Sequence, residues 1–473
     1  MQTATENERK YDVPADFALP ALAGAGEAEV HDLDATYFDT DDLRLARNKR
    51  TLRRRTGGTD AGWHLKTPGE GTSRTEHRLP LTDDGEVPGE LVGEVRALVR
   101  DRELRPVARL RTRRVETPLC DDDGRTLALV AQDQVTAETD GEQQSWQEVE
   151  VELVDGGPEV LDTVERELRR AGAEPAAGPS KLARALGDRL TAPAGSGKTK
   201  VNPVLAYARE QRDAIVAYDP GVRAGSPEAV HKMRVATRRL RSTLRTFKRS
   251  FPADQAGFLK GELKWLAGQL GEVRDGQVLE HKLIGAVDRE GPEFSAVAER
   301  IRAHLDTKVA DGRAALVRDL DGDRYLRLLD AVDQLVDADD RGEPKPLRRA
   351  RKALVKADRL LDEATLRGTD EPLHEARKAY KQARYAIEVF LPSGGKPAER
   401  LVDRLTDLQD VLGTHQDSVV AREILHDLSR DSGDGFRYGI LYARQEQIAR
   451  DSMGDLPGVI RASRKRSLRR WFD

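Results

Sequence analysis

The chain has 473 residues, 34% of which are charged, yet its formal net charge at pH 7 is only −4. That length exceeds what one hydrophobic core normally supports, so we expect about two to four domains. Because acidic and basic residues nearly balance, a general electrostatic attraction to nucleic acid is excluded, and only local basic patches can attract anions.

The first part of the chain, up to about residue 190, has the period-two alternation of β-strands. Short runs of alternating apolar and polar residues are separated by Gly, Asp and Pro. The predicted strands include residues 36–39, 51–55, 62–67, 109–115, 126–130 and 144–153. Helical patterns interrupt them near residues 90–100, 161–171 and 180–190. The pattern therefore predicts an α+β domain.

Charged residues in this region follow the same alternation, which places each set on one face of its strand. The sets are Glu6, Glu8 and Lys10; Glu148, Glu150 and Glu152; Arg53 and Arg55; Arg109, Arg111 and Arg113; and Lys66 on a further run. A solvated sheet face would explain each set alone. Their separation into carboxylate strands and basic strands favours a closed barrel that gathers both kinds around one cavity.

Such a cavity would combine side chains that bind metal ions with side chains that bind phosphate. Clustered carboxylates hold hard divalent cations such as Mg²⁺ or Mn²⁺, while Arg and Lys bind phosphate oxygens. Together they provide what phosphoryl transfer requires, since that chemistry depends mainly on positioning and charge neutralisation.

Residues 6–10, with the sequence ENERK, match the ExExK signature of the CYTH family, the triphosphate tunnel metalloenzymes. Further segments follow in the order of that family: residues 36–40, 52–55, the Lys66 strand, 74–76, 148–153 and 180–181. The region up to residue 190 therefore resembles CYTH proteins. The resemblance implies a closed antiparallel tunnel of eight strands that hydrolyses triphosphates with Mg²⁺ or Mn²⁺.

The resemblance also implies roles for individual residues. Metal binding or positioning of the attacking water would fall to Glu6, Glu8, Glu148, Glu150 and Glu152, with Lys10 beside them in the catalytic set. The triphosphate oxygens would be held by Lys10, Arg53, Arg55, Lys66, Arg111, Arg113 and Lys181. Asp133 would be a further tunnel carboxylate, and Arg78 and Arg109 would be further phosphate contacts.

A linker is predicted at residues 192–200, where Ala, Pro, Gly and Ser dominate. Residues 195–199, GSGKT, look like the end of a nucleotide-binding P-loop, but the full motif needs Gly where this chain has Ala192. We therefore expect a tunnel domain at residues 1–191, the linker, and a second domain at residues 201–473. Cys120 is the only cysteine, so no intramolecular disulfide can form.

The second domain is predicted to be all-helical, and one of its helical patterns occurs twice. Residues 231–247 and 374–390 align at an offset of 143 (374 − 231). Each copy has an apolar face: Met233, Ala236, Leu240, Leu244 and Phe247 in the first, and Ala376, Ala379, Ala383, Ile387 and Phe390 in the second. That face is expected to pack into a core.

A different face of each copy is basic and spans an arc of about 80°. Its members are His231, Arg234, Arg238 and Arg241 in the first copy, and His374, Arg377, Lys381 and Arg384 in the second. Like charges three and four residues apart repel one another, so folding gains nothing from this pattern. A polyanionic ligand would explain it, although a buried or capping role for the two histidines is an alternative.

A second duplicated segment follows each basic helix. Leu270-Gly271 with Asp275 in the first half matches Leu412-Gly413 with Asp417 in the second. Both signatures together resemble the CHAD family, the conserved-histidine α-helical domain. The resemblance implies two helical bundles related by pseudo-twofold symmetry and a surface that binds inorganic polyphosphate.

The second copy departs from the first at two places. Glu388 stands where the first copy has Arg245, and Gln416 where it has Arg274. We therefore expect the second half to hold phosphate less strongly.

The expected function is divalent-metal hydrolysis of inorganic triphosphate, with inorganic polyphosphate bound by the helical domain. Two alternatives stay open: a mainly polyphosphate-binding protein with a weakly active or idle tunnel, and a tunnel enzyme for an organic triphosphate such as thiamine triphosphate. Nucleic acid is an unlikely partner because the basic stripes lack interleaved aromatic residues. Since no apolar run reaches the length of a membrane span, we expect a cytoplasmic protein, associated with polyphosphate granules if the binding prediction holds.

Overall fold

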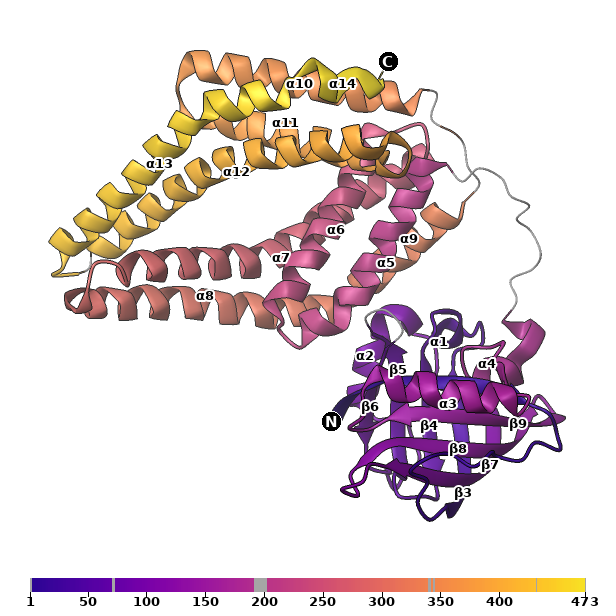
Figure 1. The fold of residues 1–473 in the computed structure, drawn as a ribbon. Helices are drawn as coiled ribbons and strands as arrows, with labels where there is room; N and C mark the ends of the chain where they lie inside the picture. The colour runs from indigo at the N-terminus through magenta and orange to yellow at the C-terminus, as the bar shows by residue number, and fades with distance from the viewer. Residues whose placement is uncertain are drawn as a thin grey trace. The chain divides into compact units, whose positions relative to one another are not determined.

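The computed structural model describes residues 2–69, 73–190, 202–338, 342, 345–430 and 432–472, and the side chains of residues 4–6 lie outside this description. Internal contacts divide the chain into two compact units, Met1–Lys198 and Thr199–Asp473 (Figure 1). The predicted linker and its P-loop-like residues lie outside the described residues.

The N-terminal unit is built on an antiparallel sheet of ten strands in the order β1-β6-β5-β4-β3-β7-β8-β9-β2-β10. The strands are β1 (Gln2–Glu6), β2 (Glu8–Val13), β3 (Glu29–Asp39), β4 (Thr51–Thr56), β5 (Gly62–Pro68), β6 (Arg74–Leu79), β7 (Arg105–Cys120), β8 (Thr126–Thr139), β9 (Glu142–Leu153) and β10 (Glu174–Pro175). The predicted mixture of strands and helices is confirmed.

The predicted count of eight strands is wrong, and closure of the sheet into a tunnel is not confirmed. The first strand is split at Asn7: β1 pairs with β6 through Glu6 and Arg74, whereas β2 pairs with β9 through Glu8 and Glu152. The two-residue β10 adds a further partner to β2. Consecutive segments of one N-terminal run thus lie at or next to opposite ends of the strand order.

Apolar side chains on the outer faces of the strands are covered by two helices (Figure 1). α3 (Pro158–Arg170) packs Leu161, Val164 and Leu168 on Val149 and Val151 of β9. α2 (Gly89–Val99) packs on the outer residues of β4 and β5 in the same way. Since residues alternate in direction along a strand, Glu148, Glu150 and Glu152 must point to the inner side.

Two shorter helices complete this unit: α1 (Arg44–Arg47) and α4 (Lys181–Leu186), followed by the 3₁₀ turn η1 (Gly187–Arg189). Ser180 caps α4, because its side chain accepts a hydrogen bond from the amide of Ala183 at 3.1 Å. Leu182 and Leu186 of α4 pack among Tyr37, Leu110 and other inward apolar residues. The cap and this packing fix Lys181 in the first turn.

The C-terminal unit consists of helices throughout its described residues. They are α5 (Pro203–Arg223), α6 (Pro227–Thr246), α7 (Ala253–Val287), α8 (Ser295–Asp321), α9 (Asp323–Asp337), α10 (Pro346–Arg367), α11 (Asp370–Glu388), α12 (Leu391–Arg430), α13 (Gly435–Ser463) and α14 (Arg466–Arg469), with 3₁₀ turns η2 (Pro292–Phe294) and η3 (Arg470–Phe472). α12 is kinked at Gly395, whose φ is 55°. Among the described residues, none of the helices has the length and apolarity to cross a membrane.

The two copies of the repeated pattern are α6 and α11, and they lie side by side. Phe247 and Phe390, which occupy equivalent positions, meet edge to face with ring centroids 6.1 Å apart. Gln382 of α11 donates a hydrogen bond to the Thr246 hydroxyl at 3.1 Å. The predicted apolar faces are buried, apart from the half-buried Ala379. Contact between equivalent phenylalanines is what a twofold relation between the repeats would produce.

α7 and α12 carry the second duplicated signature, and each forms an antiparallel hairpin with the helix that follows it (Figure 1). The ends of the two hairpins share one apolar cluster, in which Leu283 and Leu305 meet Leu425 and Leu441. The two hairpins are therefore joined at their tips, and the basic helices α6 and α11 lie toward their other end.

Candidate active site and anion groove

A cavity in the described part of the N-terminal unit is lined mainly by charged side chains. Its lining includes the cations Lys10, Arg53, Arg55, Lys66, Arg74, Arg78, Arg114 and Lys181, and the carboxylates Glu8, Asp60, Glu76, Glu150 and Glu152. Eight cations against five carboxylates leave a formal excess of three positive charges (8 − 5). These residues come from β2, β4, β5, β6, β7, β9 and α4, and Asp60 comes from the turn between β4 and β5, so strands from distant positions in the sheet contribute to the cavity.

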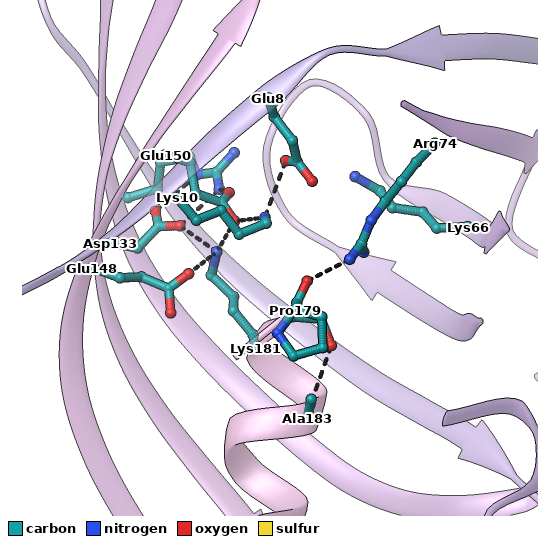
Figure 2. Close-up of polar contacts among 12 residues, drawn as sticks. Glu8, Lys10, Lys66, Arg74, Asp133, Glu148, Glu150, Pro179, Lys181 and Ala183 are labelled. Atoms are coloured by element: carbon teal, nitrogen blue, oxygen red, sulfur yellow. Dashed lines mark hydrogen bonds and ion pairs between the residues drawn. The ribbon is translucent and has the colours of Figure 1, made fainter. Parts of the chain in front are cut away.

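A cluster of three carboxylates lies at one side of this cavity. Ligand oxygens of Asp133, Glu148 and Glu150 all lie within 4.8 Å of one another. The Lys181 ammonium reaches them from α4, at 2.9 Å from Asp133, 2.7 Å from Glu148 and 2.7 Å from Glu150 (Figure 2). Trp146 also donates a hydrogen bond from Nε1 to Glu148 at 2.6 Å. The cluster is therefore occupied by a cation that belongs to the protein.

Two further cations converge on the same carboxylates. Arg114 donates to both oxygens of Asp133, at 2.8 and 2.7 Å, and to Glu150 at 2.8 Å. Lys10 donates to Glu150 and, at 3.0 Å, to Oε2 of Glu8. The other oxygen of Glu8, Oε1, is buried without a hydrogen-bond partner among the described residues. A buried carboxylate oxygen in this condition is costly unless a cation or donor reaches it.

The charges of this cluster hold one another in the ionised form. Burial alone would raise the pKa of Glu150, but Lys10, Lys181 and Arg114 outweigh it and hold that pKa well below its usual range. Burial would likewise lower the pKa of Lys181, yet Asp133, Glu150 and Glu148 raise it instead. The carboxylates are therefore ready to bind a metal cation, and the ammonium groups to bind phosphate.

On the opposite wall, the cations that are expected to bind phosphate are arranged around Glu76, which is fully buried. Its carboxylate lies 3.9 Å from Arg53, 3.9 Å from Lys66 and next to Arg78. Burial would raise the pKa of Glu76, but the hydrogen bond from His64 and the charges of Lys66 and Arg53 lower it. Glu76 thus remains an anion that positions the surrounding cations.

His64 connects this carboxylate to a second acidic anchor. Its Nδ1 lies 3.1 Å from Oε1 of Glu76, and its Nε2 lies 2.9 Å from the carbonyl oxygen of Asp60. The Asp60 side chain pairs with Arg55. Burial lowers the pKa of His64 to about 4, and the positive charges of Arg53 and Arg55 add to this effect. Because the neutral imidazole has a single N–H, it donates to Glu76 and only packs against the carbonyl oxygen of Asp60.

Most of the sequence-predicted residues meet at this cavity. Glu8, Lys10, Arg53, Arg55, Lys66, Glu150, Glu152 and Lys181 line it, as does Arg78, while Glu148 and Asp133 form the cluster behind its wall. The backbone of Glu6 pairs with Arg74, and its side chain lies outside the described residues.

The placement of Arg111 and Arg113 corrects the prediction. Both are exposed on the outer face of β7, as is Arg109, which pairs with Asp34 at 2.6 Å. Residues of opposite parity, Thr112 and Arg114, face the cavity instead. Arg114 and Asp60 were not predicted to belong to the site, and Arg74 and Glu76 were predicted only as part of the motif at residues 74–76.

A signal for Arg114 did exist in the sequence. Leu110 shares a strand face with Thr112 and Arg114, and one end of the unit's interior is apolar, where Leu110 packs near Leu182 of α4. The prediction expected only polar residues on the inner face of β7. It therefore chose the face of Arg111 and Arg113 and not the face of Leu110, Thr112 and Arg114.

The C-terminal unit has a groove of about 800 Å³ between its two repeats. All eight residues of the predicted basic stripes line it: His231, Arg234, Arg238, Arg241, His374, Arg377, Lys381 and Arg384. Residues of the second duplicated signature line it as well, among them Asp275 and Asp417. The groove thus joins both duplicated elements of both halves.

The Leu-Gly…Asp signature has a steric explanation. Arg234 crosses α7 to reach Asp275, with which it forms two hydrogen bonds of 2.6 and 2.9 Å. A Cβ atom on Gly271 would lie 3.3 Å from Nη2 of Arg234, and one on Gly413 would lie 2.8 Å from Nη2 of Arg377. Glycine therefore leaves room for the arginine of the preceding helix in both repeats.

The positive charges in the groove lower the pKa values of neighbouring basic side chains. Burial, together with Arg377, Arg238 and Arg234, lowers the pKa of Lys381 to about 7. Burial also lowers the pKa of Arg377, and burial with Arg245 and Arg238 lowers that of Arg241. Such a cluster gains from an added anion.

Glu388, one of the two departures noted in the sequence, does not lie in the groove. It is buried, accepts a hydrogen bond from the Tyr207 hydroxyl at 2.7 Å, and pairs with Arg239 at 2.8 Å. It links α11 to α5 and α6 of the first half, so its role in the structure is to join the repeats.

Comparisons with known protein families match two separate regions of the chain. The CYTH domain family matches residues 4–186, and the CHAD domain family matches residues 206–426. The uncharacterized protein MT2285 of Mycobacterium tuberculosis (strain CDC 1551) is 37% identical over 96% of both chains. Uncharacterized protein Rv2226 of Mycobacterium tuberculosis (strain H37Rv) has the same identity and coverage.

Solved structures show more distant likenesses. PptA from Streptomyces chartreusis is 18% identical with a TM-score of 0.47, covering 55% of this chain and 98% of that chain. The CHAD domain from the plant Ricinus communis is 22% identical with a TM-score of 0.40, covering 55% of this chain and 88% of that chain. From the matches to both domain families, and from the relative that spans the whole length, the chain belongs to the family of proteins that join a CYTH domain, the triphosphate tunnel type, to a CHAD domain.

Proposed function

We propose that the N-terminal unit hydrolyses inorganic triphosphate with the help of Mg²⁺ or Mn²⁺. The observation that carries this proposal is the meeting of Asp133, Glu148 and Glu150 with Lys10, Lys181 and Arg114 at one cavity. Carboxylate oxygens are the ligands that these metals prefer, and ammonium and guanidinium groups are what phosphate oxygens prefer. A cavity that offers both supports the chemistry of phosphoryl transfer.

The donor set fits a hard divalent cation. Asp133, Glu148 and Glu150 supply oxygens close enough to share one ion, and Glu8 contributes a buried oxygen without a partner among the described residues. When bound, the metal would neutralise phosphate charge and lower the pKa of a coordinated water. Glu152, which lines the cavity, and Glu6 complete the proposed acidic set.

The basic residues bind and orient the substrate. Nε of Arg53 and Nε of Arg55 are buried without hydrogen-bond partners among the described residues, so both can donate to phosphate oxygens. Lys66 and Lys10 approach from neighbouring walls of the cavity. Fixing the phosphate chain in this way keeps its bridging bond in line with the attacking water and stabilises the charge that develops on the leaving phosphate.

The lining favours an inorganic substrate over an organic triphosphate. Among the described residues that line the cavity, Tyr37 is the only aromatic one, and its hydroxyl accepts a hydrogen bond from Arg53 at 3.4 Å. A thiamine or adenine ring would need an aromatic or apolar surface on which to stack. Thiamine triphosphate is accordingly the less favoured alternative.

For the C-terminal unit, we propose that the groove binds inorganic polyphosphate. Its eight stripe residues are all cationic or can become so, and Lys381 and Arg377 have lowered pKa values that an anion would raise. This observation also favours the second candidate function, in which polyphosphate binding is the main role and the tunnel is idle.

One panel of assays tests both candidates. Phosphate release is measured with triphosphate, thiamine triphosphate, ATP and long-chain polyphosphate, each with Mg²⁺ and with Mn²⁺. Fastest release from triphosphate, dependent on metal, is the expected result. No release from any substrate, with polyphosphate still bound in a salt-dependent way, would leave only the binding function.

A further inference from the structure

The two repeats allow a residue-by-residue comparison of the groove, since α6 matches α11 at an offset of 143 and α7 matches α12 at an offset of 142 (412 − 270). Arg234 is therefore equivalent to Arg377, Arg238 to Lys381, and Asp275 to Asp417. Both arginines lie against the glycine of their signature. Differences between these pairs identify where the groove has free positive charge.

The two equivalent arginines differ in their partners. Arg234 is held by both oxygens of Asp275, so its charge is largely neutralised and its two terminal nitrogens are occupied. Among the residues that the structure describes, Arg377 forms no ion pair with Asp417. Asp417, Asp410 and Asp275 act on it only through space, and burial still lowers the pKa of Arg377.

Asp417 is engaged elsewhere, and the sequence explains why. Lys282 of α7 reaches across to Asp417 of α12 and pairs with it. The position equivalent to Lys282 in the second repeat is Ile424 (282 + 142), which cannot reach back to Asp275 with a charge. The carboxylate is therefore withdrawn from the arginine in one repeat only.

The free charge at Arg377 adjoins two more cations. Lys381 lies one turn further along α11, and Arg238 of α6 acts on both Lys381 and Arg377. Lys381 is half-buried, and neither it nor Arg238 has an ion pair or hydrogen bond to a carboxylate in the described parts of the chain. The result is a set of three basic side chains at the junction of the repeats, none with a direct carboxylate partner among the described residues.

We propose that Arg377, Lys381 and Arg238 form the primary phosphate-anchoring subsite of the groove, and that the Lys282–Asp417 pair keeps this subsite free of a competing carboxylate. The ligand class is a chain of phosphate groups, so the proposal rests on polyphosphate binding by the groove. It reverses the expectation that the second half holds phosphate less strongly. The first repeat contributes Arg238, while Arg234 plays a secondary part because Asp275 already occupies it.

The test compares Arg377→Ala with its matched control Arg234→Ala in the full-length protein. Binding of inorganic polyphosphate of one defined chain length is measured by calorimetry at fixed salt, with thermal unfolding of each variant as a check on folding. Loss of an uncompensated contact to an anion should raise Kd about tenfold or more for Arg377→Ala, and by less than about threefold for Arg234→Ala.

A second pair of variants tests the role of the carboxylates. Asp275→Asn frees Arg234 and should tighten binding. Lys282→Ile copies Ile424 and frees Asp417 to pair with Arg377, so it should weaken binding. The control is Lys264→Ile, which removes a groove cation that has no ion pair among the described residues. Lys282→Ile should weaken binding more than this control.

The outcomes separate this inference from the proposed function. If the wild-type protein binds polyphosphate but Arg377→Ala and Arg234→Ala weaken it equally, the subsite is wrong and the binding function stands. If the wild-type protein does not bind polyphosphate, both are wrong.

Discussion

The two charged regions of this protein differ in how their charges are compensated. In the cavity of the N-terminal unit, nearly every cation contacts a carboxylate: Lys181 touches three of them, and Arg114 bridges Asp133 and Glu150. In the groove of the C-terminal unit, Arg377, Lys381 and Arg238 stand together without such partners among the described residues.

The difference bears on function. Paired charges keep carboxylates ionised for a metal and hold cations in place, which suits a site that must position reacting groups. Unpaired cations store electrostatic repulsion that an incoming anion relieves, which suits a site that only binds. The same residue types, Arg, Lys and Asp, thus favour catalysis in one region and attachment in the other.

The largest effect is expected from Glu150→Gln. This change removes a charge from the proposed metal site and from the shared partner of Lys10, Lys181 and Arg114. Triphosphate hydrolysis should fall about 10²- to 10³-fold, as for loss of a main electrostatic contributor. Phosphate release at saturating metal measures it. Glu142→Gln, on an exposed position of the same strand, is the control and should keep full activity.

A smaller loss is expected from Arg114→Ala, and its neighbour provides the control. Arg114 faces the cavity, whereas Arg113 is exposed on the outer face of β7. Arg114→Ala should lower kcat/KM for triphosphate about 10²-fold, while Arg113→Ala should stay within about twofold. A greater loss for Arg113→Ala would mean that the face of β7 is assigned incorrectly.

His64→Leu should have an intermediate effect, because the polar contacts of His64 among the described residues are to Glu76 and Asp60 and not to a substrate-binding cation. It holds Glu76, the partner of Arg53, by a hydrogen bond and packs against the backbone of Asp60, the partner of Arg55. Loss of such a supporting contact typically costs about 10- to 100-fold, and we expect the lower end, mainly in KM. His64→Gln, which keeps one hydrogen bond, should recover part of the loss; equal kinetics for both variants and wild type would contradict the role.

The smallest effect is a change in pH dependence at the groove. In the free protein the pKa of Lys381 is about 7, and a bound anion raises it, so binding takes up a proton. Polyphosphate affinity should therefore decrease as pH rises above 7, approaching tenfold per pH unit at most. Lys381→Arg, which copies Arg238, stays charged and should flatten this slope.

The charged and titratable groups around Lys381 come from three helices. It faces Arg377 and Arg384 of its own helix and Arg234 and Arg238 of α6, and Asp410 of α12 also lines the groove. Burial lowers the pKa of both His231 and His374, which favours their neutral forms in the free protein. An unchanged slope in Lys381→Arg would assign the dependence to another group.

Much of this arrangement could be predicted from the sequence, for identifiable reasons. On β9, Val149 and Val151 mark the outer face, so the alternating Glu residues had to face inward. On α6 and α11, apolar residues at helical spacing separated the core face from the basic face.

The remainder depends on information that alternation does not contain. Val107 and Ala108 of β7 are both buried beside an irregularity in its pairing with β3, so the strand does not alternate cleanly there. The split of the first strand at Asn7 depends on which neighbour each half pairs with. The partner of Asp417, Lys282, lies 135 residues away in the chain. Such tertiary pairings cannot be read from local spacing.

The most direct test of the account measures hydrolysis of triphosphate and binding of polyphosphate in the same three proteins: wild type, Glu150→Gln and Arg377→Ala. We expect Glu150→Gln to lose hydrolysis and keep polyphosphate affinity, and Arg377→Ala to lose affinity and keep hydrolysis of triphosphate. If either substitution removed both properties from a folded protein, or if Glu150→Gln still hydrolysed triphosphate at the wild-type rate, the division between a catalytic cavity and a binding groove would be contradicted.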